Sequence, residues 1–159
     1  MNLFPWFLFA HILGAIIAFG PSFSFPIIAR YASKEPMHAN FATRVSERVS
    51  SVQVVPLALL QGITGVALIL TGNIDVTKTN WLLVGIVLYL IAITFAIFVQ
   101  TPAVKKVIEM TSGGPPPGGP PIGGPPPALM ASIKRVQQGG MLLLVLVISI
   151  VFLMVVKPF

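Results

Sequence analysis

The chain has 159 residues, of which 55% are hydrophobic and only 9% are charged, and its mean hydropathy is +0.93. Soluble domains carry about 25% charged residues, so this composition excludes a water-soluble globular protein and predicts an integral membrane protein. There is no cysteine, which excludes disulfides, thiolate metal sites and cysteine nucleophiles. The net charge of +6 does not indicate nucleic-acid binding, because the basic residues lie in short loops, where they set membrane orientation.

Four uncharged stretches are long enough to cross a bilayer, since about 20 apolar residues span a hydrocarbon core of about 30 Å. They are expected at about residues 4–28, 51–71, 81–99 and 139–156. Each is apolar on all sides, whereas the strands of a membrane barrel alternate apolar and polar residues. The sequence therefore predicts an all-α fold, a single transmembrane domain over 1–159 built as a four-helix bundle. No basic segment or small-residue cleavage site marks a signal peptide, so the first span is expected to be retained.

The basic residues predict the orientation of this bundle. Eight of the ten lie in the loops after the first and third spans, and they are Arg30, Lys34, Arg44, Arg48, Lys105, Lys106, Lys134 and Arg135. Only Lys78 and Lys157 lie elsewhere. Because cytoplasmic loops carry the excess of Lys and Arg, these two loops are expected in the cytoplasm and both termini outside.

The loop between the third and fourth spans contains GGPPPGGPPIGGPPP, residues 113–127. Proline and glycine favour polyproline II and flexible coil here. Fully extended at about 3.1 Å per residue, the segment would reach over about 40 Å, whereas neighbouring helices lie only about 10 Å apart. This Pro/Gly-rich loop is therefore longer than the connection needs, and it is interpreted either as an uncharged spacer or as a docking strip for a partner subunit.

Residues 37–50, MHANFATRVSERVS, are predicted to extend the second span as a helix on the cytoplasmic side. Asn40 is expected to cap this extension, because asparagine is a favoured N-cap residue. Arg44 and Arg48 lie one turn apart on it and would suit anionic lipid headgroups.

His11 is the most informative polar residue of the apolar stretches. It lies about seven residues into the first span, or roughly 10 Å below the hydrocarbon surface. Ionisable groups at such depth usually face the bundle interior and mark a function. Gly14, Ala15 and Ala18 follow on the same helix face, and small residues let a neighbouring helix or a flat cofactor approach closely.

Two roles for His11 are open. As a structural residue it would hydrogen-bond Gln61, Ser149 or a water and so link helices. As a ligand it would hold the iron of haem b, with Met154 as a weaker candidate on the other side. His38 belongs to a cytoplasmic loop, so ligation by two histidines is disfavoured. Copper bound by His11 and Met154 would have only two ligands, which do not define a site.

Three further polar residues lie within the spans, namely Gln53, Gln61 and Tyr89. They are interpreted as interhelical hydrogen-bonding groups, and they offer little of the polar path that a small transporter would need. All acidic residues lie in loops, and they are Glu35, Glu47, Asp75 and Glu109. Together with the absence of P-loop, zinc-protease and hydrolase motifs, this predicts a protein without enzymatic activity.

The order of these features resembles a bacterial family of predicted four-helix integral membrane proteins of unknown function. The resemblance rests on FLFAHILGAIIAFG in the first span, LQGITGVALILTG in the second, Trp81 opening the third, and the terminal FLMVVKP. It implies a fold and a multi-pass location in the bacterial cytoplasmic (inner) membrane, and no activity.

More distantly, the chain resembles haem-binding protoporphyrinogen oxidase-like proteins and copper-resistance membrane domains, because these four-helix membrane proteins also have a histidine on the first helix. In the former, a lysine on the third helix accompanies the histidine, and residues 81–99 contain none. Only His11 carries over, as a candidate ligand.

These features favour a non-enzymatic membrane protein that packs, as an accessory subunit, against a larger respiratory or photosynthetic complex. Its expected partners are membrane lipid and other membrane subunits, or further copies of itself. The alternative is a b-type haem or redox protein that uses His11 as an axial ligand.

Overall fold

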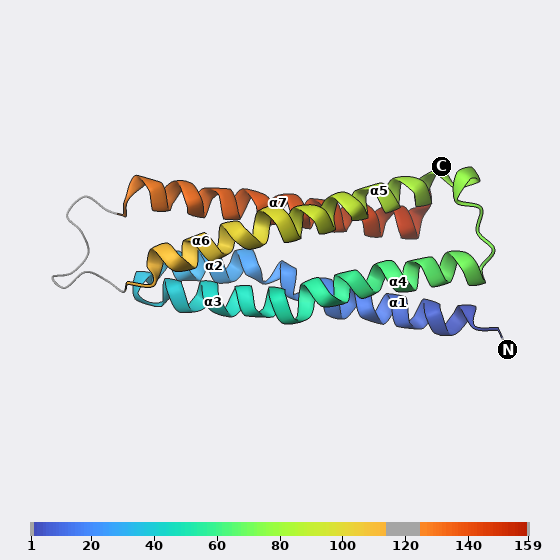
Figure 1. Cartoon of the computed structure of the whole chain (residues 1–159), viewed down its shortest axis with the longest axis horizontal. Helices are drawn as coiled ribbons and strands as arrows, with labels where there is room; N and C mark the ends of the chain where they lie inside the picture. The colour runs from blue at the N-terminus through green and yellow to red at the C-terminus, as the bar shows by residue number, and fades with distance from the viewer. Residues whose placement is uncertain (1, 114–124, 159) are drawn as a thin grey trace.

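The computed structural model describes residues 2–113 and 125–158, and over these residues it contains helices, turns and no strand (Figure 1). The α-helices, in chain order, are α1 (Phe4–Phe19), α2 (Phe25–Lys34), α3 (Ala39–Val49), α4 (Val55–Thr71), α5 (Asn80–Phe95), α6 (Thr101–Thr111) and α7 (Pro127–Val156). Short 3-10 or π-helical turns lie between them, namely η1 (Gly20–Phe23), η2 (Pro36–His38), η3 (Ser50–Val54), η4 (Val76–Lys78) and η5 (Ala96–Gln100). The predicted all-α fold class is confirmed.

These elements join into four long rods, Phe4–Lys34, Ala39–Thr71, Asn80–Thr111 and Pro127–Val156, each apolar enough to cross a membrane. With 30 to 33 residues each, the rods are about 45–50 Å long at 1.5 Å per residue. They exceed a hydrocarbon core of about 30 Å, so each rod continues beyond its apolar stretch, and the first three do so as the amphipathic helices α2, α3 and α6.

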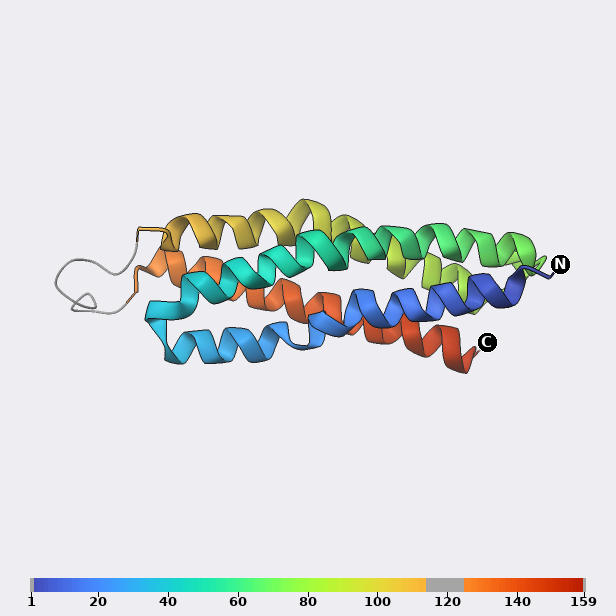
Figure 2. The same cartoon turned by 90° about the horizontal axis from the view of Figure 1, so that it is seen from below.

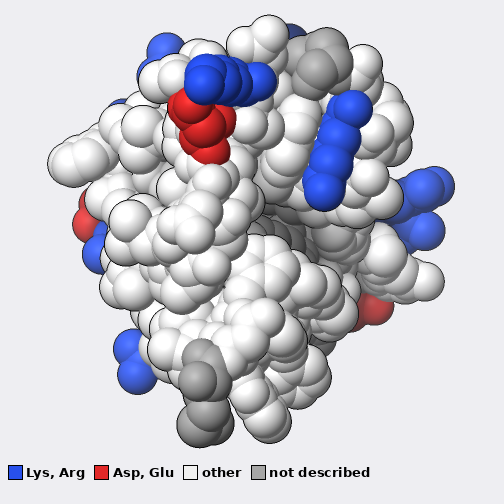
Figure 3. Space-filling model, turned by 90° about the vertical axis from the view of Figure 1, so that its right-hand side faces the viewer, with Lys and Arg blue, Asp and Glu red and all other residues white. Residues whose placement is uncertain are grey.

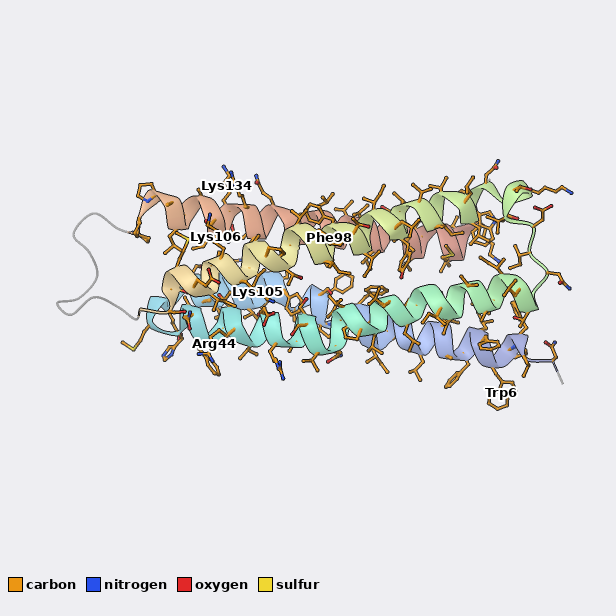
Figure 4. The ribbon with its side chains drawn as sticks, viewed as in Figure 1. Trp6, Arg44, Phe98, Lys105, Lys106 and Lys134 are labelled. Carbon is orange, nitrogen blue, oxygen red and sulfur yellow. The ribbon has the colours of Figure 1, made fainter. Side chains whose placement is uncertain are left out.

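The two ends of the bundle differ in charge. Both chain termini lie at one end, here called the terminal end, and the segment around residues 113–127 lies at the other, called the linker end (Figure 1). Figure 4 shows Arg44, Lys105, Lys106 and Lys134 toward the linker end and Trp6 at the terminal end. Residues 114–124 of the GGPPP repeat fall outside the described residues, and the two interpretations of that loop remain predictions.

Three of the four rods are interrupted near their middle, and a proline accounts for each interruption. Proline has no backbone N–H and its ring clashes with the preceding helical turn. In the first rod Pro21 lies in η1, and in the second and third rods Pro56 and Pro102 are the second residues after the wider turns η3 and η5. By contrast, α7 is one unbroken helix (Figures 1 and 2).

The rods pack as two helix pairs in the terminal half, α1 against α4 and α5 against α7, while α3 and α6 join the pairs in the linker half. The buried hydrophobic residues in the described part of the chain are Ala18, Ala58, Leu82, Ala92, Val107 and Leu153. Alanine at half of these positions lets helix backbones approach closely. Figure 3, which looks onto the terminal end, shows a hollow between the pairs, surrounded by side chains without charge.

The expectation that Asn40 caps a helix is wrong. The helix α3 begins at Ala39, its N-cap residue is His38, and no side chain caps it. Asn40 therefore lies inside the first turn, and its Nδ2 donates across the bundle to the Ile108 carbonyl at 3.1 Å and to Thr111 Oγ1 at 2.8 Å. This amide stabilises the contact of α3 with α6 in the linker half.

Candidate functional site

The close packing of α1 on α4 brings His11 beside Thr64. The two helices run antiparallel, and His11 Nδ1 lies 2.7 Å from Thr64 Oγ1. Gly65, the next residue, borders the imidazole: a Cβ at this position would make ordinary contact with His11 Cε1, at 3.6 Å. The imidazole is half-buried between the helices, as expected for an ionisable group inside a bundle.

The hydrogen bonds available to Thr64 favour one of the two neutral forms of the His11 imidazole. Thr64 Oγ1 also lies 3.1 Å from the Leu60 carbonyl and 3.2 Å from the Gln61 carbonyl. A threonine hydroxyl has a single proton, and a backbone carbonyl can only accept it. When that proton goes to a carbonyl, Thr64 Oγ1 accepts from His11 Nδ1–H, and the lone pair of the imidazole is then on Nε2.

Gln61 is the buried polar residue of the interface, with 6% of its surface exposed. Its amide lies against Gly14 of α1, and a Cβ at Gly14 would collide with Gln61 Nε2. Within the described residues, Gln61 Oε1 is buried without a hydrogen-bond partner, which is costly in an apolar interior. His11, Gln61 and Thr64 together are called the polar cluster below.

Gln53 compensates for the break in the first rod. In an α-helix the N–H of residue 21 would bond to the carbonyl of Ile17, but Pro21 has no N–H. Gln53 Nε2 donates to this Ile17 carbonyl at 2.9 Å. Since an unsatisfied backbone group costs several kcal/mol in hydrocarbon, Gln53 acts as a structural residue that permits the kink.

Tyr89 connects the two helix pairs. Its hydroxyl donates to the Ala58 carbonyl at 3.0 Å, and Gly62 makes room for it, because a Cβ there would lie 2.6 Å from the hydroxyl oxygen. Tyr89 and Gln53 thus each use their donor on a backbone carbonyl of a neighbouring helix, in agreement with the interpretation of these residues as interhelical links.

Met154 and His38 lie apart from the polar cluster. The terminal methyl of Met154 contacts Gly85 of α5, where a Cβ would approach it to 2.5 Å. His11 instead contacts residues of α4, so the two candidate haem ligands belong to different helix pairs. His38 is exposed at the linker end. Ser149 bonds to its own helix at the Val145 carbonyl, 2.8 Å away, and Thr64 is the partner of His11.

Thr64 and Gln100 are functional candidates that sequence reasoning did not identify. Gln100 Nε2 donates to the Val136 carbonyl of α7 at 3.0 Å, and Gln100 Oε1 lies over Gly139. Both residues had a signal in the sequence. Thr64 follows Gln61 by three residues, hence on the same helix face, and Gln100 stands just before Pro102 as Gln53 stands before Pro56.

The chemistry available to this site is hydrogen bonding and ligation by one imidazole. In the described part of the chain, no three His, Cys, Asp or Glu side chains gather closely enough to hold a metal ion. The polar cluster contains no carboxylate that would make His11 a general base by orienting its proton. An imidazole with its lone pair on Nε2, however, is suited to coordinate iron or to accept a hydrogen bond.

A family model described as "Predicted integral membrane protein (DUF2269)" matches residues 6–158. The match covers nearly the whole chain, so the chain belongs to this family of integral membrane proteins, and the resemblance seen in the sequence is confirmed. No curated protein and no solved structure matches the chain.

Proposed function

We propose that this member of the DUF2269 family lies in a bacterial cytoplasmic membrane with the linker end in the cytoplasm and both termini outside. The charge asymmetry supports this orientation, because the helices and turns toward the linker end hold eight basic residues and those at the terminal end hold Lys78 and Lys157. Cytoplasmic loops carry such an excess of Lys and Arg. Cysteines introduced at Thr77 and Ser33 test it: a membrane-impermeant maleimide added to intact cells should label only the Thr77→Cys variant.

In that membrane the protein acts as an accessory subunit without enzymatic activity, packed against a larger respiratory or photosynthetic complex. The observation that supports this function is the thin core of the bundle. None of the phenylalanines from Phe4 to Phe152 is buried, and no large side chain in the described residues is less than 2% exposed. Large apolar faces of the rods therefore remain available to other membrane helices, which associate by close packing.

Purification from the native membrane in a mild detergent tests this proposal. A tagged chain should co-purify with other membrane subunits in a fixed ratio, and the same preparation in a harsher detergent should release it as a single chain. A lone monomer under the mild condition, with the lipid retained, would contradict an accessory role.

A b-type haem or redox protein is the second candidate, and the hydrogen bond from His11 Nδ1 to Thr64 favours it. Haem and metal ligands of this kind usually donate one ring N–H to a second group, which directs the other nitrogen to the metal. The fit is partial. His11 meets this requirement, whereas Met154 lies on the other helix pair against Gly85. Bound haem would supply one-electron transfer, and His11 would hold its iron from one side.

An absorption spectrum distinguishes the two candidates. After expression with ample haem, a haem protein should show a Soret band that His11→Ala abolishes and that Thr64→Val shifts or weakens. If no Soret band appears, or if the band is unchanged in His11→Ala, the haem function is ruled out and the accessory role stands unaffected.

A further inference from the structure

A groove of about 480 Å³ runs between the third rod and α7 on the outside of the bundle. The two rods run antiparallel, so Phe95 lies level with Leu142 toward the terminal end, and Ala103 lies level with Arg135 toward the linker end. These residues line the groove together with Phe98, which is 73% exposed. The groove is therefore apolar at one end and basic at the other, over about 12 Å of helix.

Two features of the backbone shape this groove. The π-helical turn η5 makes the third rod wider at its centre, and the missing side chain of Gly139 lets Gln100 approach α7 closely. Gln100 folds over Gly139 and bonds to the Val136 carbonyl, so it forms the floor of the groove. The side chain of Gln138, in contrast, is exposed at the groove and free to donate from its amide.

The basic end of the groove lacks a neutralising partner. Arg135 is exposed, and the single salt bridge among the described residues joins Lys78 to Asp75 at the other end of the protein. Lys134 is adjacent in sequence, and Lys106 lies one helical turn beyond Ala103. Figure 4 shows both lysines nearer the linker end than Phe98. Glu109, one turn beyond Lys106, is also exposed and unpaired.

We propose that this groove binds one anionic phospholipid, with its phosphate at Arg135 and Gln138 and an acyl chain along Phe95, Phe98 and Leu142. Guanidinium groups bind phosphate through two parallel hydrogen bonds, and basic pockets between membrane helices bind anionic headgroups. An apolar slot that continues from the phosphate position into the hydrocarbon fits a lipid tail. An acidic peptide would leave that slot empty, so the charge and the shape together select a lipid.

Native mass spectrometry of the full chain in mild detergent tests this site. Phosphatidylglycerol and phosphatidylcholine with identical acyl chains are added in equal amounts, and the first bound lipid is counted. The wild-type protein should retain phosphatidylglycerol preferentially. Arg135→Gln should reduce this preference about fivefold, as expected for one basic side chain at a headgroup.

Two further variants separate this site from general attraction by the basic end. Arg30→Gln removes another exposed charge, from α2 in the linker half and outside the groove, and should leave the preference within about twofold of wild type. Leu142→Trp fills the apolar slot and should lower retention of both lipids. The proposal is overturned if the wild type retains both lipids equally, if Arg30→Gln acts like Arg135→Gln, or if Leu142→Trp retains lipid as the wild type does. Circular dichroism verifies that each variant remains helical.

Discussion

In the α1·α4 pair the side chains that cross the interface are polar, whereas in the α5·α7 pair they are mostly apolar. His11 bonds to Thr64, and Gln61 lies buried against Gly14. At the corresponding level of the other pair, the methyl of Met154 lies against Gly85. Nearer the linker end, the Gln100 amide of the third rod bonds to α7, while Arg135 and Gln138 of α7 lie on the outer surface.

This difference follows from which polar residues each pair of helices carries, and from whether those residues face a neighbouring helix or the lipid. A polar group inside a membrane bundle must find a partner within the protein, because lipid offers none. Where α1 and α4 approach through small residues, backbone carbonyls and hydroxyls become accessible as such partners. The comparison teaches that the α1·α4 pair holds its polar side chains inside, while α5 and α7 meet through apolar groups and α7 presents Arg135 and Gln138 to lipid.

The strongest test replaces the two glutamines that stand beside the helix breaks. Gln53→Leu should lower the free energy of unfolding by about 1–3 kcal/mol, because it leaves the Ile17 carbonyl without a donor. Gln100→Leu should cost only about 0.5–1.5 kcal/mol, since the Val136 carbonyl belongs to the unbroken α7 and keeps its helical N–H. Titration with a denaturing detergent, followed by far-UV circular dichroism, measures both values. Equal losses in the two variants would contradict the idea that the Ile17 carbonyl depends on Gln53 for its hydrogen bond.

Matched glycine substitutions compare the packing of the two pairs. Gly14→Ala should destabilise the protein by about 1–2 kcal/mol, because the new methyl collides with the buried amide of Gln61 and overpacking is costly. Gly85→Ala meets only the flexible end of Met154, which adapts readily, so this change should be neutral. Gly65→Ala is the control within α4, because its Cβ would make ordinary contact with His11 at 3.6 Å. If Gly85→Ala is the more damaging change, the assignment of the tighter interface to α1·α4 is wrong.

The unpartnered amide of Gln61 leads to a prediction of opposite sign. Gln61→Met has a similar volume and removes the buried Oε1 that has no hydrogen-bond partner among the described residues. It should raise the free energy of unfolding by about 1 kcal/mol, at the lower end of the cost of an unsatisfied buried group. The same titration in mild detergent measures this gain. A loss of stability would mean that a water or ligand bonds to Gln61 in the membrane and that the α1·α4 interface is more hydrated than its side chains indicate.

The four spans were predictable from the sequence, and the contacts of the site largely were not. A long apolar stretch is enough to predict a membrane-spanning helix, because in hydrocarbon every backbone N–H and C=O must find its hydrogen-bond partner within the protein. Thr64 gave little indication of its role, since a threonine in a helix commonly bonds to its own preceding turn. Pro21 does indicate that the carbonyl of Ile17 lacks its helical donor. Which side chain donates to it instead depends on the packing of α1 against α4, and a single sequence does not specify that packing.

A smaller effect is expected for the hydrogen bond between His11 and Thr64. Such interhelical bonds contribute about 0.6 kcal/mol on average. A double-mutant cycle with His11→Ala and Thr64→Val should give a coupling energy of this size, while Thr64→Ser, which keeps the hydroxyl, should retain it. A coupling energy of zero would remove the structural basis for assigning the lone pair of His11 to Nε2, and with it the support for a ligand role.

The smallest effect concerns the loop that joins the two pairs, between α4 and α5. There Asp75 accepts hydrogen bonds from the Thr77 hydroxyl and N–H at 2.6 and 3.0 Å and pairs with Lys78 at 3.3 Å. The Thr77 hydroxyl bond, followed by the Lys78 contact, lowers the pKa of Asp75 below that of a free aspartate. The carboxylate therefore stabilises the loop above the unfolded-state pKa, and this contribution is lost as the pH falls through the folded-state value.

Asp75→Asn should remove this acid dependence while changing the melting temperature at neutral pH only slightly, because the side chain is fully exposed and such ion pairs contribute little. Melting curves of both proteins at neutral pH and at about pH 3 measure the difference. An identical drop on acidification in the two proteins would show that Asp75 does not stabilise the loop. A large loss at neutral pH would mean instead that this loop, and not only Tyr89, holds the two pairs together at the terminal end.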